Sequence, residues 1–172
     1  MLIENTEISD VKVVNPLVHN DERGYFFESY SLKSFKDNPL PNHFVQENEV
    51  FSKKGVLRGL HYQLEFPQGK LVRAVVGTIF DVAVDIRLGS PTYCKYVAVE
   101  LSAENKKMLY VPEGFAHGYV VLSDKSIVSY KCTNFYNPSD EYGIKWNDKT
   151  IDIDWGNNSP IISKKDDDLP LL

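Results

Sequence analysis

The sequence has few of the residues that mark several large classes of protein. It contains only two cysteines, Cys94 and Cys132, and four histidines among 172 residues. Two cysteines cannot supply a disulfide framework or a cysteine-rich metal cluster, so we interpret both as buried thiols. Basic residues are also in the minority, with 19 Lys and Arg against 24 Asp and Glu and a net charge of −5. This balance lacks the basic footprint of a nucleic-acid-binding protein, and we expect no nucleic-acid partner.

Long apolar runs and a leader sequence are also missing. No stretch approaches the roughly 18 consecutive apolar residues that mark a membrane-spanning helix. Residues 1–7 are acidic and do not have the form of a signal peptide. We therefore expect a cytoplasmic protein with no membrane partner. With 42% hydrophobic and 25% charged residues, the composition indicates one globular domain spanning residues 1–172.

Short β-strands dominate the expected secondary structure. In residues 79–87 the even positions are apolar and most odd positions are charged, which predicts a half-buried strand. Two segments, 31–37 and 102–106, have the pattern of short helices. Further strands, separated by turns, are expected at 71–76, 96–101, 117–122 and 127–133. Because no long crossover helices are present, this pattern favours an all-β antiparallel sandwich or barrel.

Two glycine-flanked segments carry histidines. Residues 55–63 contain Arg58 and His61, which strict alternation along a strand would place on opposite faces. A bulge at Gly59 would bring the two side chains together. Taken alone, His61 is more simply explained as a hydrogen-bonded core histidine. Residues 112–118 form a Pro-x-Gly-x-x-His turn before an apolar strand, and this segment resembles the second motif of the cupins, small double-stranded β-helix barrels.

The cupin resemblance does not extend to a metal site. Metal-binding cupins supply His-x-His and a later Glu from their first motif, whereas this chain has His61, then Gln63, and then Lys70. A lysine ammonium has no lone pair to offer a metal and repels it. The same group beside His61 and His117 suits an anionic ligand or a developing oxyanion. We therefore expect no metal.

Two more segments combine aromatic and polar residues. Residues 130–136 contain several aromatic side chains, and a tyrosine hydroxyl held in a dry pocket can act as a general acid. In residues 21–28, Arg23 is suited to phosphates, Phe26 to stacking on a base, and Glu28 to accepting hydrogen bonds from the base edge. Taken singly, these segments are more simply explained as core and loop aromatics and as a surface turn followed by a strand.

Together the segments resemble the dTDP-4-dehydrorhamnose 3,5-epimerase family. The resemblance implies a cupin fold, a jelly-roll barrel with short peripheral helices. It also implies an isomerase that epimerises dTDP-4-dehydro-6-deoxy-D-glucose at C3 and C5, without cofactor or metal, to give dTDP-4-dehydro-L-rhamnose. The segments that carry the resemblance are 21–28, 44–48, 55–63, 67–72, 81–87, 112–119, 130–136 and 162–166.

The resemblance also implies roles for individual residues. His61 is the base, Asp166 orients it, Tyr130 is the acid on the opposite face of the sugar, and Lys70 stabilises the enolate oxygen. Family members deliver part of the segment at 21–28 across a dimer interface, so a homodimer is implied. The implied substrate-binding residues are Arg23, Phe26, Glu28, Gln46, Glu47, Asn48, Arg58, His117, Tyr136, Glu141 and Lys165.

The sequence departs from the family pattern at several positions, and two other functions stay open. Glu47 stands where the family usually has Asp, and Asp167 and Asp168 follow Asp166 where the family often has Arg. One alternative is a mono-epimerase that inverts only C3 or only C5 of the same or another nucleotide-linked 4-keto sugar. The other is a non-catalytic or metal-dependent cupin that binds sugars. Asp85 is left out of the site because it can form a structural ion network with Arg87.

Overall fold

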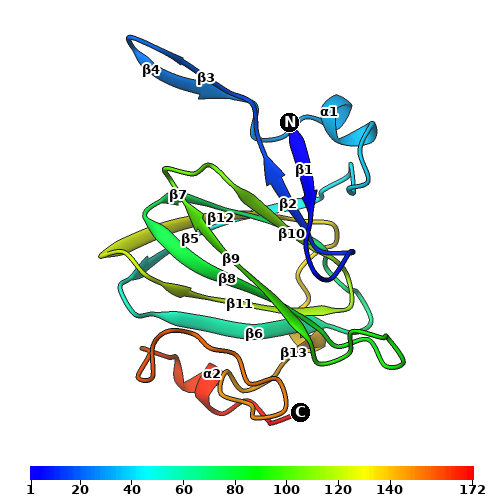
Figure 1. Ribbon diagram of the computed structural model, residues 1–172. Coiled ribbons are helices and arrows are strands. Elements are labelled where there is room, and N and C mark those ends of the chain that lie inside the picture. The colour runs from blue at the N-terminus through cyan, green and yellow to red at the C-terminus, as the bar shows by residue number, and fades with distance from the viewer.

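Two antiparallel β-sheets packed face to face form the body of the protein (Figure 1). The computed structural model describes all residues, 1–172. The six-stranded sheet has the order β1 (Leu2–Asn5), β2 (Lys12–Asn15), β10 (Met108–Val111), β7 (Lys70–Val76), β12 (Lys125–Cys132) and β5 (Gln46–Lys53). The five-stranded sheet has the order β13 (Glu141–Gly143), β6 (Leu57–Gln63), β11 (Phe115–Val121), β8 (Thr78–Asp85) and β9 (Tyr96–Ser102). The prediction of an all-β fold is confirmed.

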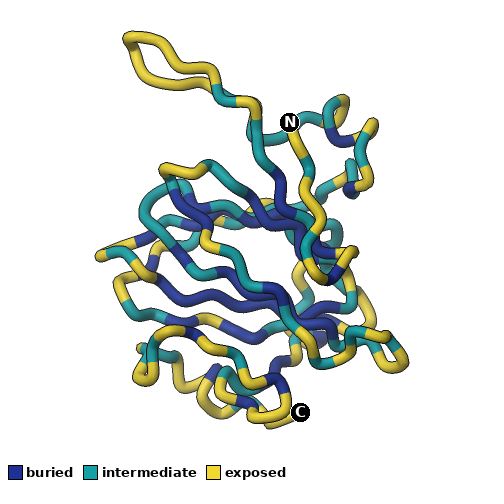
Figure 2. Tube along the Cα trace, viewed as in Figure 1, coloured by how far each residue is buried: buried dark blue, intermediate teal, exposed yellow.

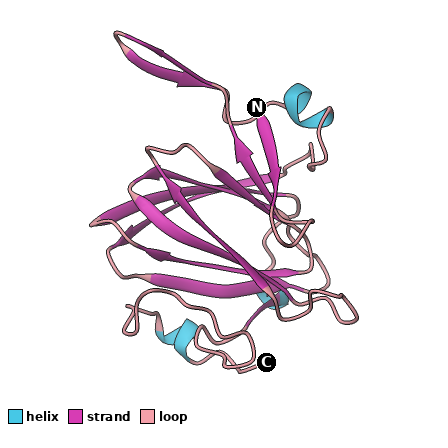
Figure 3. Ribbon diagram, viewed as in Figure 1, coloured by secondary structure: helices cyan, strands magenta, loops and turns pink.

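Helices are few and short, and they lie outside the two sheets (Figure 3). They are α1 (Leu32–Lys36), the 3₁₀ turn η1 (Pro138–Asp140) and α2 (Lys164–Asp167). The helix expected at 31–37 is confirmed, and Ser31 caps its N-terminus. The helix expected at 102–106 is wrong, because Ser102 and Asn105 accept each other's backbone N–H and close a turn instead. None of the helices has the length and apolar character needed to cross a membrane.

A separate two-stranded hairpin extends away from the sheets, at the top of Figure 1. It consists of β3 (Val18–Asp21) and β4 (Gly24–Phe27). It contacts the rest of the chain through cation–π interactions, with Lys106 over the Tyr25 ring and Arg73 over the Phe27 ring. The tip is exposed (Figure 2).

Apolar side chains cover both faces of the five-stranded sheet. Its inner face packs on the six-stranded sheet through residues such as Ile79 and Ala83, whereas Val82 and Val84 on the outer face pack in a second cluster with Trp155 of the C-terminal segment. The sheet strands are accordingly dark blue along much of their length in Figure 2. The strand predicted in residues 79–87 is confirmed over Thr78–Asp85, but the prediction that it is half-buried is wrong, since β8 is buried on both faces.

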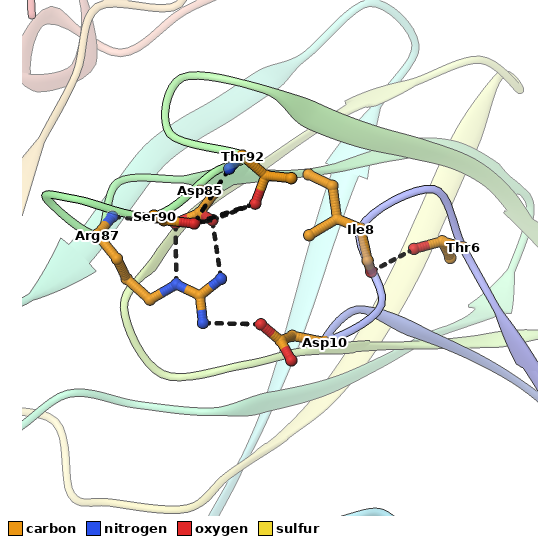
Figure 4. Close-up of polar contacts among 7 residues, drawn as sticks. All are labelled: Thr6, Ile8, Asp10, Asp85, Arg87, Ser90 and Thr92. Atoms are coloured by element: carbon orange, nitrogen blue, oxygen red, sulfur yellow. Dashed lines mark hydrogen bonds and ion pairs between the residues drawn. The ribbon is translucent and has the colours of Figure 1, made fainter.

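The charged side chains of β8 consequently lie in the interior and need partners. Asp85 is completely buried and accepts hydrogen bonds from Arg87 Nε at 2.9 Å, from Ser90 Oγ and from Thr92 Oγ1 (Figure 4). Arg87 also pairs with Asp10 at 2.8 Å, which connects the N-terminal segment to this loop. Burial opposes ionisation of Asp85, but Arg87 and the two hydroxyls hold its pKa well below the usual range. This is the structural ion network that the sequence suggested.

Candidate active site

A cavity of about 290 Å³ opens between the two sheets, and most of the residues expected at the site line it. One wall comes from β6 and β11 of the five-stranded sheet, and the other from β5, β7 and β12 of the six-stranded sheet. The predicted site residues that it contains are Gln46, Asn48, Arg58, His61, Lys70, His117, Tyr130, Tyr136 and Glu141. Segments far apart in the sequence thus meet in one hollow of the size and polarity of a small-molecule site.

The two histidines of the cavity are direct neighbours across β6 and β11. His61 is the register partner of His117, and the register then shifts before Tyr119 meets Arg58. The extra residue lies at Gly59, whose φ is +109°, and a Cβ there would lie 2.5 Å from the backbone oxygen of His117. The bulge expected at Gly59 is therefore confirmed, and it brings Arg58 and His61 to the same cavity.

His61 is held from behind by Asp166. Its Nε2 lies 2.8 Å from Asp166 Oδ1, and the second oxygen, Oδ2, accepts the N–H of Gly59 at 3.3 Å. Burial raises the pKa of the Asp166 carboxyl, but the hydrogen bonds from His61, Gly59 and Ser163 outweigh this and bring it below the usual range. A carboxylate only accepts, so the Nε2 of His61 carries a hydrogen and its Nδ1 stays free to take a proton.

A second histidine–aspartate pair lies deeper in the same wall. His117 Nε2 is 2.9 Å from Asp81 Oδ1, and the side chain of Asp81 is 0% exposed. Asp81 comes from β8, the strand next to β11 in the sheet. The ring of His117 is thereby fixed at the floor of the cavity.

The opposite wall supplies an ammonium group and a phenol. Burial lowers the pKa of Lys70, although the nearby charges of Asp81 and Glu141 act in the other direction. Burial also raises the pKa of Tyr130 to about 12, so this hydroxyl keeps its proton at neutral pH. Lys70 and Tyr130 thus face His61 from the six-stranded sheet.

Glu141 lines the cavity and has two side-chain partners. Tyr136 donates its hydroxyl to Glu141 Oε2 at 2.7 Å, and Lys165 of α2 forms an ion pair with the same oxygen. Burial raises the pKa of Glu141, but these two partners outweigh it and lower the pKa overall. Lys165 does not line the cavity wall itself, but it lies directly behind a residue that does.

Four predicted binding residues lie away from the cavity of their own chain. Arg23, Phe26 and Glu28 belong to the hairpin and the turn after it, where 71% of Phe26 is exposed. Glu47 alternates with Gln46 and Asn48 on β5, so its side chain lies on the opposite face and bonds to Ser129 at 2.7 Å and to Lys131. The structure therefore does not bring these four residues together with His61.

Asp81, behind the cavity wall, and Tyr119, in the wall, are among the residues that the sequence did not assign to the site. Asp81 occupies an odd position of the alternating segment and was therefore expected to face outward. Tyr119 stands where the matching family motif has Phe, and it lines the cavity. A buried aspartate on the strand next to that of a histidine has no local sequence signal, because the pairing depends on sheet order rather than on spacing.

The comparisons with known proteins agree with this geometry. A family model described as dTDP-4-dehydrorhamnose 3,5-epimerase matches residues 5–172. A dTDP-4-dehydrorhamnose 3,5-epimerase from Shigella flexneri is 55% identical over 168 residues, which cover 96% of this chain and 93% of the relative.

Solved structures show the same fold. The dTDP-6-deoxy-D-glucose-3,5-epimerase of Legionella pneumophila, in complex with dTDP-4-keto-L-rhamnose, has a TM-score of 0.94 and 46% identity over 99% of this chain and 92% of that one. The dTDP-4-dehydrorhamnose 3,5-epimerase of Bacillus anthracis, with TDP and PPi bound, has a TM-score of 0.96 and 41% identity, with 99% of both chains covered. The cupin fold expected from the sequence is thereby confirmed, and the chain belongs to the dTDP-4-dehydrorhamnose 3,5-epimerase family.

Proposed function

We propose that this chain is an isomerase that epimerises dTDP-4-dehydro-6-deoxy-D-glucose at C3 and C5, giving dTDP-4-dehydro-L-rhamnose. One observation carries the proposal: His61 and Tyr130 line the same cavity from opposite sheets. Inversion at carbon requires a proton to leave one face of the sugar ring and another to arrive at the other face. A base and an acid on facing walls meet that requirement. The names and bound ligands of the relatives support the choice of substrate.

The reaction begins at a C–H bond next to the C4 ketone. The free nitrogen of His61 takes the proton, and Asp166 stabilises the imidazolium that forms. The electron pair of the C–H bond moves into the ring, and the negative charge develops on O4. Lys70 stabilises this charge, and one preorganised donor of this kind contributes about 3–4 kcal/mol to lowering the barrier. Tyr130 then gives its proton to the same carbon from the other face. His61 releases the proton it took to solvent and Tyr130 regains one from solvent, and the sequence then repeats at the second centre.

The residues of the cavity fit a reaction without a metal or redox cofactor. The Gln63 amide that stands at the second histidine position of metal-binding cupins donates to the backbone oxygen of Phe66 at 2.6 Å and accepts the N–H of Asn137 at 2.9 Å. Both ends of the Gln63 amide are therefore used in hydrogen bonds to the loops at Phe66 and Asn137. An ammonium at Lys70 repels a cation from the same space. Proton transfer next to a ketone requires neither electron transfer nor an external oxidant.

The decisive experiment is turnover in D2O. We expect dTDP-4-dehydro-6-deoxy-D-glucose to gain deuterium at both C3 and C5 with inverted configuration, detected by mass spectrometry and NMR. Deuterium at a single carbon would identify a mono-epimerase, and no exchange by folded protein would refute the proposed substrate. Loss of activity with EDTA and recovery with added metal would refute the mechanism.

The acid role of Tyr130 is tested by its removal. Tyr130→Phe keeps the ring and deletes only the hydroxyl, so we expect proton removal to continue while inversion slows about 100-fold. The measurement is the ratio of solvent exchange to epimerised product. Tyr62→Phe is a matched control, since Tyr62 also lines the cavity but has no assigned role. Full epimerisation by Tyr130→Phe would exclude Tyr130 as the acid.

We also propose that the enzyme is a homodimer in which each hairpin reaches the cavity of the partner. Arg23 and Phe26 are exposed on that hairpin and lie outside their own cavity, which supports this arrangement. The test mixes His61→Asn with the double variant Arg23→Ala/Phe26→Ala. If sites are shared, half of the sites in mixed dimers are intact, and about a quarter of wild-type activity returns after subunit exchange. Monomeric wild-type protein, or no recovery in demonstrated mixed dimers, would refute sharing.

We further propose that residues 1–172 work as one domain in the cytoplasm. Asp166 in α2 completes a pair with His61 in β6, so the C-terminal segment is part of the same functional unit as the sheets. Cys94 and Cys132 are both free thiols, which is compatible with a reducing compartment. Fractionation of cells that produce the protein is the direct measurement of its location.

A further inference from the structure

The pair formed by His117 and Asp81 carries an inference beyond the proposed reaction. Asp81 does not line the cavity, yet it pairs with His117 and its charge acts on Lys70, and both of these residues do line the cavity. Only one of its oxygens is used, because Oδ1 meets His117 Nε2 at 2.9 Å while Oδ2 is buried without a hydrogen-bond partner. A buried carboxylate with half of its acceptors empty is costly, which is unusual for a residue that serves stability alone.

The contrast with Asp85 shows what a structural aspartate on this strand looks like. Both residues lie on β8, point to the same side and are 0% exposed. Asp85 accepts from the side chains of Arg87, Ser90 and Thr92 and is fully satisfied (Figure 4). Asp81 instead faces a titratable ring and an ammonium group, and it has no arginine or hydroxyl holding it.

The surroundings of Asp81 place its charge between the two walls of the site. His117 and Tyr119 lie beside it on β11, and the charge of Lys70, which comes from β7 and lines the same cavity as His117, acts on its charge. A lysine ammonium in such a buried position keeps its proton only if a negative charge lies near it. The other titratable or charged groups that face Lys70 and the cavity floor are His61 on β6, Tyr130 and Cys132 on β12, Arg58 on β6 and Glu141 on β13.

We propose that Asp81 is a positioning residue of the active site, which fixes the His117 ring with its hydrogen on Nε2 and supplies the counter-charge that keeps Lys70 protonated. Asp81 does not touch the substrate. It acts through His117 and Lys70, which line the cavity. The inference rests on the proposed function for its catalytic consequence, but the state of the His117 ring can be measured without any turnover.

The first test uses the wild-type protein and ¹⁵N NMR of the imidazole nitrogens. The chain has only four histidines, so four sets of ring signals are expected, and His117→Gln identifies the set of His117. We expect the His117 Nε2 to carry hydrogen at every pH at which the protein is folded. A neutral His117 ring with its hydrogen on Nδ1 would overturn the proposal, whether or not the protein is an epimerase.

The second test compares Asp81→Asn with Asp85→Asn. An amide at position 81 keeps the shape but removes the charge, so we expect kcat to fall about 10- to 100-fold, the loss of one charged hydrogen bond. The Lys70 pKa should fall as well, because its counter-charge is gone, and the alkaline limb of the pH profile should move to lower pH by about one unit. dTDP binding should change less than kcat. In Asp85→Asn we expect lower thermal stability with an unchanged pH profile.

The outcomes separate the alternatives. A uniform loss of activity at all pH values, with unchanged His117 signals, would assign Asp81 a structural role only and overturn the proposal. Wild-type protein that does not exchange deuterium with the sugar would refute the proposed function, while the NMR result would still decide the tautomer. If Asp81→Asn fails to fold, two other measurements decide the question. The first is the tautomer of His117 in the wild-type protein. The second is the alkaline limb of the wild-type pH profile, compared with the alkaline limb of Lys70→Arg.

Discussion

The two histidine–aspartate pairs of this protein have nearly the same geometry but different surroundings. The distances are 2.8 Å for His61–Asp166 and 2.9 Å for His117–Asp81. In the first pair 27% of the histidine side chain is exposed, compared with 8% in the second. The first aspartate arrives from a helix outside the sheets, whereas the second belongs to the strand next to its histidine.

This difference shows that hydrogen-bond geometry alone does not assign a catalytic role. An imidazole that is partly open to the cavity can meet the substrate and exchange a proton with it, as the base must. An imidazole packed in the floor is better suited to present a fixed charge or hydrogen bond. Access therefore distinguishes the reactive pair, His61–Asp166, from the supporting pair.

The largest expected effect comes from removing the exposed base. His61→Asn should lower kcat by at least about 10³-fold, because no other group at this position can take the proton. Binding of dTDP should stay near the wild-type value, measured by calorimetry. His43→Asn is the matched control, since His43 is exposed and lies in a loop outside the cavity. Wild-type turnover by His61→Asn would reverse the assignment of the two pairs.

Removing the partner of the base should have a smaller effect. Asp166→Asn leaves His61 in place but removes the charge that stabilises its protonated form, so we expect kcat to fall about 10- to 100-fold. Asp167→Asn changes the next residue of the helix, which forms an exposed pair with Lys145 at 3.3 Å, and it should keep full activity. Equal activity of the two variants would mean that Asp166 does not act on His61.

A change at the bulge should disturb both pairs at once. Gly59→Ala introduces a Cβ 2.5 Å from the backbone oxygen of His117 at a φ of +109°. Strain of this kind costs about 1–3 kcal/mol, which urea denaturation can measure. Because β6 and β11 must separate, the ¹⁵N signals of His61 and His117 should both shift. Gly24→Ala has open space around it and serves as the control for a positive φ without a clash. If the ¹⁵N signals of only one of the two histidines shift, the His61–Asp166 and His117–Asp81 pairs are not coupled through the bulge.

The smallest effect on activity is expected at Asp85, which pairs with no histidine. Asp85→Asn should lower the free energy of unfolding at pH 7 by about 2 kcal/mol and leave kcat unchanged. Since the folded-state pKa of Asp85 is below its unfolded value, its contribution is complete above the unfolded pKa and is lost as the pH falls through the folded value. The free energy of unfolding of the variant should thus depend less on pH than that of the wild type below about pH 4.

A surface pair gives the comparison for that measurement. The Asp124 side chain is 98% exposed and lies 3.9 Å from Lys54. Asp124→Asn should change the free energy of unfolding by less than about 1 kcal/mol at any pH. If both variants lose the same stability, the Asp85 network does not support the fold in the way its burial indicates.

The fold class and much of the cavity wall could be predicted from the sequence because both depend on local patterns. Strand segments were recognised from alternation, and the bulge at Gly59 followed from the conflict between Arg58 and His61. The resemblance to a known family then brought Asp166 to His61. No local pattern near residue 166 carries that information, since the residues 164–168 alone are typical of a solvated tail.

Other features could not be predicted because they depend on which elements cover which faces. Alternation along residues 79–87 indicates a strand, but it does not reveal that a C-terminal segment buries the second face. The charged face of this strand, which includes Asp81, was for that reason expected outside the core. The helical expectation at 102–106 failed because Ser102 and Asn105 satisfy the backbone within a turn. Glu47 was expected in the site with Gln46 and Asn48, but alternation along β5 turns its side chain to the other face, where Ser129 and Lys131 bind it.

The position of Asp166 in the chain also affects when the protein can first act. His61 and Asp166 are 105 residues apart, and Asp166 lies in α2, the last helix of the chain. At ribosomal rates of about 5–20 residues per second, the base is made roughly 5–20 s before the carboxylate that orients it. A nascent chain with both sheets already synthesised therefore still lacks an oriented base, and catalytic competence coincides with completion of the domain.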